Sequence, residues 1–136
     1  MAEYTLTIPT TVDEGANVPF NETIVNGGCS IRHREGSGII RLKGGTCCKP
    51  ALYTVYFGAN VFGTQGLIQL AMFLDGEQIP ESVMSVTASG TTAINSVSSM
   101  TQIPVYEGSS SVSVRVITGG DITFNTANII VKKEAY

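Results

Sequence analysis

The segment Ser111-Val112-Ser113-Val114-Arg115-Val116 has the most regular alternation of polar and apolar residues in this chain of 136 amino acids. Side chains of a β-strand point alternately to opposite faces, so this alternation predicts a strand with one buried face. The turn residues Gly119-Gly120-Asp121 follow, and residues 122–133 then continue with many β-branched side chains. This part of the chain therefore predicts two neighbouring strands, of which the second is the last strand of the protein.

The overall composition shows the same preference for strands. The chain contains 13 Val, 13 Ile and 15 Thr, or 41 β-branched residues, against 6 Leu and 9 Ala, or 15. Such a composition excludes helical bundles and coiled coils. The length suits one domain, and the charged fraction of 14% is well below the roughly 25% of ordinary globular proteins. Because so few charges cover the surface, we expect part of its apolar area to be covered by other chains.

Further alternating segments are separated by glycine-containing turns, and the pair Asp75-Gly76 is the strongest hairpin signal among them. Together they predict eight to ten strands and no helix. The predicted fold is an all-β, antiparallel jelly-roll sandwich. The expected strands are residues 4–8, 18–25, 29–34, 38–43, 52–62, 67–74, 77–79, 94–103, 112–116 and 122–133, with a looser pattern over residues 82–105.

The net charge of −3 is distributed unevenly along the chain. Residues 1–29 carry four acids and no base, residues 30–50 five bases and one acid, and residues 51–136 three bases and six acids. We expect the acidic residues 1–17 to form an N-terminal strand or a docking arm, and residues 18–136 to form the jelly-roll domain. The bases at 32, 34, 41 and 43 alternate with apolar residues, as on the solvated face of two strands. Nucleic acid is therefore not an expected partner.

Three cysteines, Cys29, Cys47 and Cys48, cannot all pair within one chain. They are candidates for a disulfide within or between chains, or for plain thiols at a strand end and in a loop. A zinc site that also uses His33 is a weaker alternative, because the sequence has no Cys-x-x-Cys spacing and no second histidine. We therefore expect no metal site.

No catalytic set of residues is recognisable in the sequence. His33 is the only histidine, and its position in an alternating segment favours a structural role. The acidic residues are scattered through turns, and there is no phosphate-binding loop or nucleophile motif. Hence we expect neither an enzyme nor a cofactor. The sequence also lacks a secretory leader and a membrane span, which predicts a soluble chain made in the cytoplasm with no membrane partner.

Several segments, in their order and spacing, resemble the superfamily of trimeric jelly rolls that includes tumour necrosis factor and the complement globular heads. The hairpin at residues 68–77 resembles the family's Asn-Gly hairpin, with Asp75 in place of the asparagine. The other similar segments are Val18-Pro19-Phe20-Asn21, residues 36–40, Ala51-Leu52-Tyr53-Thr54-Val55-Tyr56-Phe57, where Ala51 replaces the family's glycine, residues 103–117 and residues 124–131.

The resemblance implies a homotrimer in which one sheet of each subunit packs around a threefold axis. By this analogy, the strand that buries Tyr53 and Val55 points Thr54, Tyr56 and Gly58 toward the axis, so these three are the expected trimer-interface residues. No metal or loop site of the family is carried over, because serine stands at position 109, where the family often has an acid.

Phage and bacterial trimeric heads of this type also resemble the chain. They imply a structural virion protein, most plausibly a capsid decoration protein that binds the major capsid protein or another virion protein. Its expected location is the virion surface, after assembly in the host cytoplasm. The alternatives are the receptor- or glycan-binding tip of a bacteriophage fibre, with Tyr106, Asn60 or Gln65 as candidate contacts, and a bacterial surface or spore-coat trimer.

Overall fold

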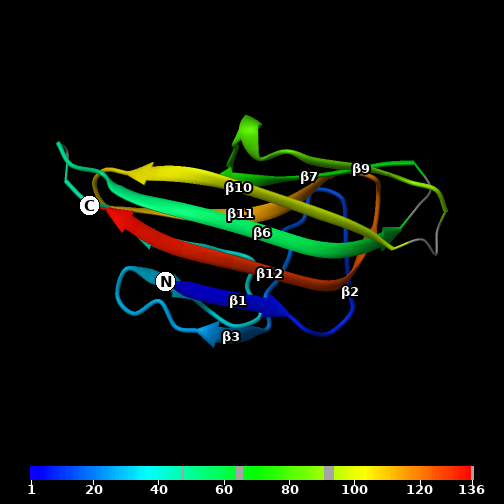
Figure 1. Cartoon of the computed structure of the whole chain (residues 1–136), viewed down its shortest axis with the longest axis horizontal. Coiled ribbons are helices and arrows are strands. Elements are labelled where there is room, and N and C mark those ends of the chain that lie inside the picture. Colours follow the sequence, from blue (N-terminus) through cyan, green and yellow to red (C-terminus); the bar gives the residue numbers. More distant parts are fainter. Residues whose placement is uncertain (47, 64–65, 91–93, 136) are drawn as a thin grey trace.

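Two antiparallel sheets pack face to face in the computed structural model, which describes residues 1–46, 48–63, 66–90 and 94–135 (Figure 1). Sheet A has the strand order β10 (Asn95–Val105), β6 (Ala51–Gly63), β12 (Ile122–Ala135), β1 (Ala2–Leu6) and β3 (Glu22–Val25), and β2 (Thr10–Val12) also pairs with β12. Sheet B has the order β4 (Ile31–His33), β5 (Ile40–Lys43), β11 (Ser109–Thr118), β7 (Gly66–Leu74) and β8 (Glu77–Gln78), and β9 (Met84–Ala88) also pairs with β7. A 3-10 turn at Pro80–Ser82 precedes β9.

The core lies between the two sheets and confirms the predicted antiparallel β-sandwich. Inward side chains from both sheets are fully buried, among them Tyr53 and Phe57 on β6, Phe124 on β12 and Met72 on β7. The ring of Phe20 meets that of Phe57 edge to face, with 6.3 Å between the centroids. Such aromatic contacts between layers fix how the two sheets sit on one another.

The Asp75-Gly76 turn joins β7 to β8 as predicted. Both residues have a positive φ, 51° and 86°, which is the backbone conformation of the favoured hairpin turns. The Asp75 carboxylate accepts a hydrogen bond from the backbone N–H of Ser111 at 2.8 Å, and the Asp75 N–H donates to the Ser111 carbonyl at 2.8 Å. The turn is thereby tied to the first residues of β11.

Some predicted strand limits are wrong. The strand expected at residues 18–25 begins only at Glu22, although Val18 and Phe20 are fully buried. Pro19 has no N–H to donate to a ladder, so this segment is held instead by single bonds from Val18 N–H to the Val114 carbonyl and from Phe20 N–H to the Ser37 carbonyl. β2, and β9 within the looser pattern of residues 82–105, lie outside the ten expected strands and bring the described total to twelve, above the eight to ten expected.

Residues 1–17 contribute the strands β1 and β2 to sheet A. β1 lies between β12 and β3, and β2 pairs with the first residues of β12 (Figure 1). Ala2, Tyr4 and Leu6 are buried in the same core as the rest of the sandwich. The described residues contain no helix that is long and apolar enough to cross a membrane.

Candidate interaction surfaces

The outward face of sheet A carries the three residues expected at a trimer interface. β6 buries every second side chain, including Tyr53, Val55 and Phe57. Thr54, Tyr56 and Gly58 alternate with them and therefore point away from the core, as the sequence predicted. Of the three, Tyr56 is the most accessible, with 39% of its surface exposed.

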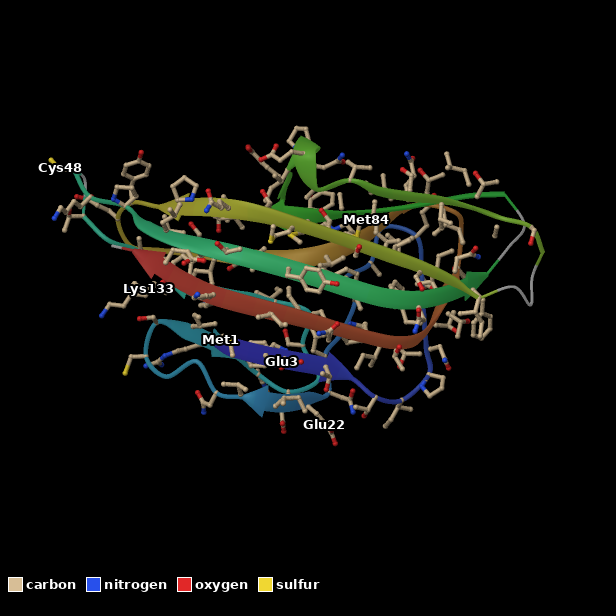
Figure 2. The ribbon with its side chains drawn as sticks, viewed as in Figure 1. Met1, Glu3, Glu22, Cys48, Met84 and Lys133 are labelled. Atoms are coloured by element: carbon tan, nitrogen blue, oxygen red, sulfur yellow. The ribbon has the colours of Figure 1, made fainter. Side chains whose placement is uncertain are left out.

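A row of side chains with little charge crosses four adjacent strands at Tyr56. The strand register places Met100 of β10 and Ile130 of β12 on either side of Tyr56, and Glu3 of β1 beyond Ile130. Met100 is 65% exposed and Ile130 is half-buried. Three large apolar side chains thus lie side by side on an open sheet face, which is a typical sign of a surface that another molecule covers. In Figure 2 the labelled Glu3 marks the end of this row on β1.

The rest of this outward face is polar but almost uncharged. On β10, β6 and β12, its only charged side chains in the described residues are Lys132 and Glu134, which lie 3.9 Å apart and pair with each other. Glu134 also accepts a hydrogen bond from the Thr54 hydroxyl at 2.9 Å. Because charged groups are depleted at the centres of protein interfaces, this composition suits burial against another subunit.

A hollow of about 630 Å³ lies beside the Tyr56 row, over the backbone of Gly58. Glycine has no side chain, so the ring of Tyr56 can lie against Gly58, where a Cβ atom would come within 3.1 Å of the Tyr56 hydroxyl. Several amides and hydroxyls of the wall bond one another: Ser96 Oγ donates to Asn60 Oδ1 at 2.7 Å, and Asn60 Nδ2 donates to Thr126 Oγ1 at 3.2 Å. Since these groups already have partners, covering them costs less than covering free polar groups.

His33 packs inside the open edge of the sandwich. Its Nε2–H donates to the Ser37 carbonyl at 2.7 Å, and its ring centroid lies 4.5 Å from that of Tyr4 and 6.1 Å from that of Phe20. The other ring nitrogen, Nδ1, is buried and has no hydrogen-bond partner in the described residues. Burial also raises the pKa of the neighbouring Tyr4 phenol. These contacts hold the ring in place, as suits the structural role expected from the sequence.

Cys48 lies in the loop between β5 and β6, and Cys29 lies shortly before β4 in a hollow that Lys43 of β5 also lines. Cys29 and Cys48 are both exposed, and Cys29 is a free thiol, so the two are not joined. Figure 2 shows Cys48 at the tip of the loop, at the same end as Lys133. Cys47 lies outside the described residues, so a bond to a second chain stays a prediction. In the described part of the chain, no three His, Cys, Asp or Glu side chains lie close enough to hold a metal ion.

A small acidic group stabilises the turn between β11 and β12. The Glu14 carboxylate accepts hydrogen bonds from the backbone N–H groups of Gly119 and Gly120, both at 3.1 Å. The nearby negative charge of Asp13 raises the pKa of Asp121, and a hydrogen bond between the two carboxyl groups adds to the effect. These contacts within the protein explain why Glu14, Asp13 and Asp121 lie together at this turn, so their grouping is no evidence for a bound ligand.

On sheet B, Arg32 and Arg41 are directly opposite each other in the β4–β5 ladder, and both are exposed. Like charges at opposite positions destabilise a sheet. We therefore expect Arg32→Glu to raise the free energy of unfolding by about 0.2–1 kcal/mol, because it replaces repulsion by an ion pair. Urea denaturation at low salt measures the change. Lys49→Glu makes the same charge change in a loop without an opposing arginine, and an equal gain there would contradict the pairwise explanation.

Sequence reasoning found the β6 residues of the sheet A face but not their neighbours. Met100, Ile130 and Asn128 reach this face only through the pairing of β6 with β10 and β12. One signal in the sequence could have pointed to Ile130. Adjacent residues of a strand face opposite sides, so one of the two isoleucines Ile129 and Ile130 had to lie outside the core, and Ile129 is the buried one.

Comparisons with known proteins identify the fold. The sequence matches no family model and no curated protein. The structure is similar to the globular domain of a zebrafish complement 1qA protein, with 12% identity, a TM-score of 0.68, and coverage of 95% of this chain and 94% of that one. It is similar to an Eiger TNF from S. frugiperda (11% identity, TM-score 0.65, coverage 99% and 93%) and to the PRD1 vertex protein P5 (17% identity, TM-score 0.58, coverage 97% and 94%). The resemblance predicted from the sequence is thus confirmed at the level of the fold: the chain has the jelly-roll fold shared by complement globular heads, tumour necrosis factors and a phage vertex protein.

Proposed function

We propose that this protein is a non-enzymatic structural component of a virion surface and that it works as a homotrimer. The observation that carries the proposal is the outward face of sheet A, where Tyr56, Met100 and Ile130 form an apolar row, with Glu3 as the next side chain beyond Ile130. An apolar row beside a hollow gives each copy two different surfaces that can meet in a head-to-tail contact. Such a contact closes into a ring of three when the rotation between copies is one third of a full turn.

The neighbouring structures favour a role in a particle over a role in catalysis. One of them is a vertex protein of the virus PRD1, and the others are a complement globular domain and a tumour necrosis factor. Within the virion role, decoration of the capsid shell is the form we favour, with the major capsid protein or another virion protein as the partner. Immunogold labelling of native particles tests this form. Label over the shell supports it, whereas label at fibre ends or on bacterial surfaces would contradict it.

The trimer itself gives the first prediction. The purified chain should have a mass of three times 14.3 kDa in multi-angle light scattering at micromolar concentration. The physical reason is that the apolar row on sheet A is covered only in the assembled form. Small-angle scattering of the same sample should show a compact particle. A mass of 14.3 kDa at all concentrations tested would contradict the homotrimer.

A glycan-binding role is the second candidate, and it rests on the hollow over Gly58. Asn60, Asn128 and Ser98 line that hollow beside the ring of Tyr56, and an aromatic ring with convergent amides and hydroxyls is a common lining for polar ligands. In a trimer built on this face the hollow is covered, so the two candidates exclude each other. If the chain is a monomer, binding to a glycan array followed by loss in Asn60→Ala would support this second candidate. Tyr106 is exposed on a turn away from the hollow, and Gln65 lies outside the described residues.

A further inference from the structure

The outward face of β4 and β5 gathers positive charges that have no acidic partner. Arg32 and Arg41 are opposite each other in the ladder, and Lys43 follows Arg41 by two residues, so all three side chains lie on one face. All three are exposed, and in the described part of the chain none of them forms an ion pair. Opposing like charges cost stability. Because proteins break such local rules mainly at functional sites, this face is a candidate for binding an anion.

A hollow of about 380 Å³ on this face is lined by the three cations. The hydroxyls of Ser30 and Ser109 also line it, and none of its described lining residues is acidic. The Lys43 N–H donates to the Ser30 carbonyl at 2.8 Å, which holds Ser30 beside β5. On the other side, Ser109 is opposite Lys43 in the β5–β11 ladder. Backbone pairing on both sides therefore fixes the residues around the hollow.

The side chains around the hollow are arranged as donors. Arg41 donates to the Ser109 hydroxyl at 3.3 Å, so its guanidinium leans toward the end of β5 that carries Lys43. The guanidinium keeps further N–H groups for a ligand. Lys133 Nζ donates to Ser30 Oγ at 3.5 Å and adds a positive charge beside the hollow. A hydroxyl that accepts a bond still has its own proton to donate, so Ser30 can also bond an anion.

Acidic side chains lie around this face but do not line the hollow. The Glu35 carboxylate accepts a hydrogen bond from the Thr23 N–H of β3 at 3.2 Å. The Asp75 carboxylate accepts one from the Ser111 N–H at 2.8 Å. Neither of these acids, nor Glu107 before β11, is among the residues that line the hollow. An anion from outside therefore has no carboxylate of the described lining to displace.

A phosphomonoester suits these donors better than a carboxylate does. It has a charge of about −1.5 to −2 at neutral pH and three strong acceptor oxygens, so cations on different sides can each contact one oxygen. A carboxylate has a single charge and two oxygens. The rest of the wall is mainly apolar and includes Cys29, as is common where charged side chains leave their carbon stems on the surface. An organic group that carries the phosphate can contact this apolar wall.

A long polyanion suits the site less well than a single phosphate group. The net charge of −3 on the whole chain repels a polymer beyond the hollow. Single-stranded nucleic acid usually stacks its bases on aromatic rings. No aromatic side chain is among the described residues that line this hollow.

We propose that the hollow between Arg32, Arg41 and Lys43 binds the phosphate group of an organic phosphomonoester. The two guanidinium groups and the ammonium group contact the phosphate oxygens, and the hydroxyls of Ser30 and Ser109 donate further bonds. The organic group lies on the apolar wall, so free inorganic phosphate binds the same donors more weakly. The site is on sheet B, and it does not depend on the trimer proposed for sheet A.

Alkylation of Cys29 tests the proposal, because this exposed thiol lines the hollow and the exposed thiol of Cys48 does not. The protein is treated with iodoacetamide at about pH 7.5, where a phosphomonoester with a second pKa of about 6 is mostly a dianion. Peptide mass spectrometry follows both cysteines as phenyl phosphate is added at constant ionic strength. We expect saturable protection of Cys29 and little change at Cys48. Inorganic phosphate should need a higher concentration for the same protection.

Variants and a direct contact measurement identify the donors. Arg32→Ala combined with Arg41→Ala should raise the half-protecting concentration of phenyl phosphate about tenfold or more, because it removes two charge-assisted donors. Lys49→Ala is the matched control: it removes an exposed cation that does not line the hollow, and it should leave that concentration unchanged. In NMR spectra of the unchanged protein, the Nε–H signals of Arg32 and Arg41 should shift over the same range of phenyl phosphate.

Several results would overturn the proposal. Arginine Nε–H signals that do not respond to phenyl phosphate would show that the hollow does not bind it, whatever the labelling shows. Equal protection by benzoate would show that any anion suffices. Tighter, arginine-dependent binding of an oligothymidine would assign the surface to nucleic acid, and an unchanged double-arginine variant would place the site elsewhere. Circular dichroism and the mass of each variant, measured on the same samples, separate these results from loss of the fold or of the trimer.

Discussion

Replacing Tyr56 by arginine should convert the trimer into folded monomers. Tyr56 stands at the centre of the apolar row, between Met100 and Ile130. In a ring of three copies, the substitution brings three guanidinium groups into the contact. In the described residues of β10, β6 and β12, the only charged outward side chains, Lys132 and Glu134, are already paired with each other. Burying an unpaired charge in an interface costs several kcal/mol, enough to lower the association constant by at least a factor of about a thousand.

Light scattering and circular dichroism measure the two parts of this prediction. The mass should fall from three times 14.3 kDa to 14.3 kDa, while the β-sheet spectrum is retained, because Tyr56 points away from the core. Leu67→Arg is the matched control: Leu67 is also an exposed apolar residue in a strand, but it lies on β7 of sheet B. That variant should stay trimeric. If both variants dissociate, or if neither does, the assignment of Tyr56 to the trimer interface is wrong.

Replacing the next residue, Phe57, by alanine should instead destabilise the fold itself. Phe57 is fully buried, and its ring contacts that of Phe20 across the core. Truncating a buried phenylalanine to alanine removes apolar contacts and leaves a cavity, which costs about 3–5 kcal/mol of unfolding free energy. For a domain of this size, such a loss lowers the melting temperature by roughly 10–20 °C.

Thermal unfolding at a fixed protein concentration measures this loss, because the stability of an oligomer depends on concentration. Tyr56→Ala provides the comparison, since it truncates an aromatic residue one position away on the opposite face of β6. Tyr56→Ala should weaken the trimer, but the melting temperature of its isolated subunit should be close to that of the unchanged subunit. Equal melting temperatures for monomeric Phe57→Ala and Tyr56→Ala would contradict the assignment of the two faces.

The assignment of these two faces could be made from the sequence alone. Alternation along residues 51–62 predicts which side chains of β6 are buried, because the period of two is a property of every extended strand. The Asp75-Gly76 hairpin was predictable for a similar reason, since few residues adopt a positive φ at low cost. Pro19 shows the limit of this reasoning: the apolar residues around it are buried as expected, but the segment cannot join a ladder.

The surfaces, in contrast, depend on contacts between residues far apart in the chain. Met100 lies beside Tyr56, and Ile130 beside both Tyr56 and Glu3, only because β10, β6, β12 and β1 pair in one particular register. The facing of Arg32 and Arg41 likewise follows from the β4–β5 register. Local alternation thus determines which side of each strand faces the core. Which strands become neighbours, and so which side chains gather on a face, is determined by packing across the whole sandwich, because pairing energy and core burial act between segments that no local pattern connects.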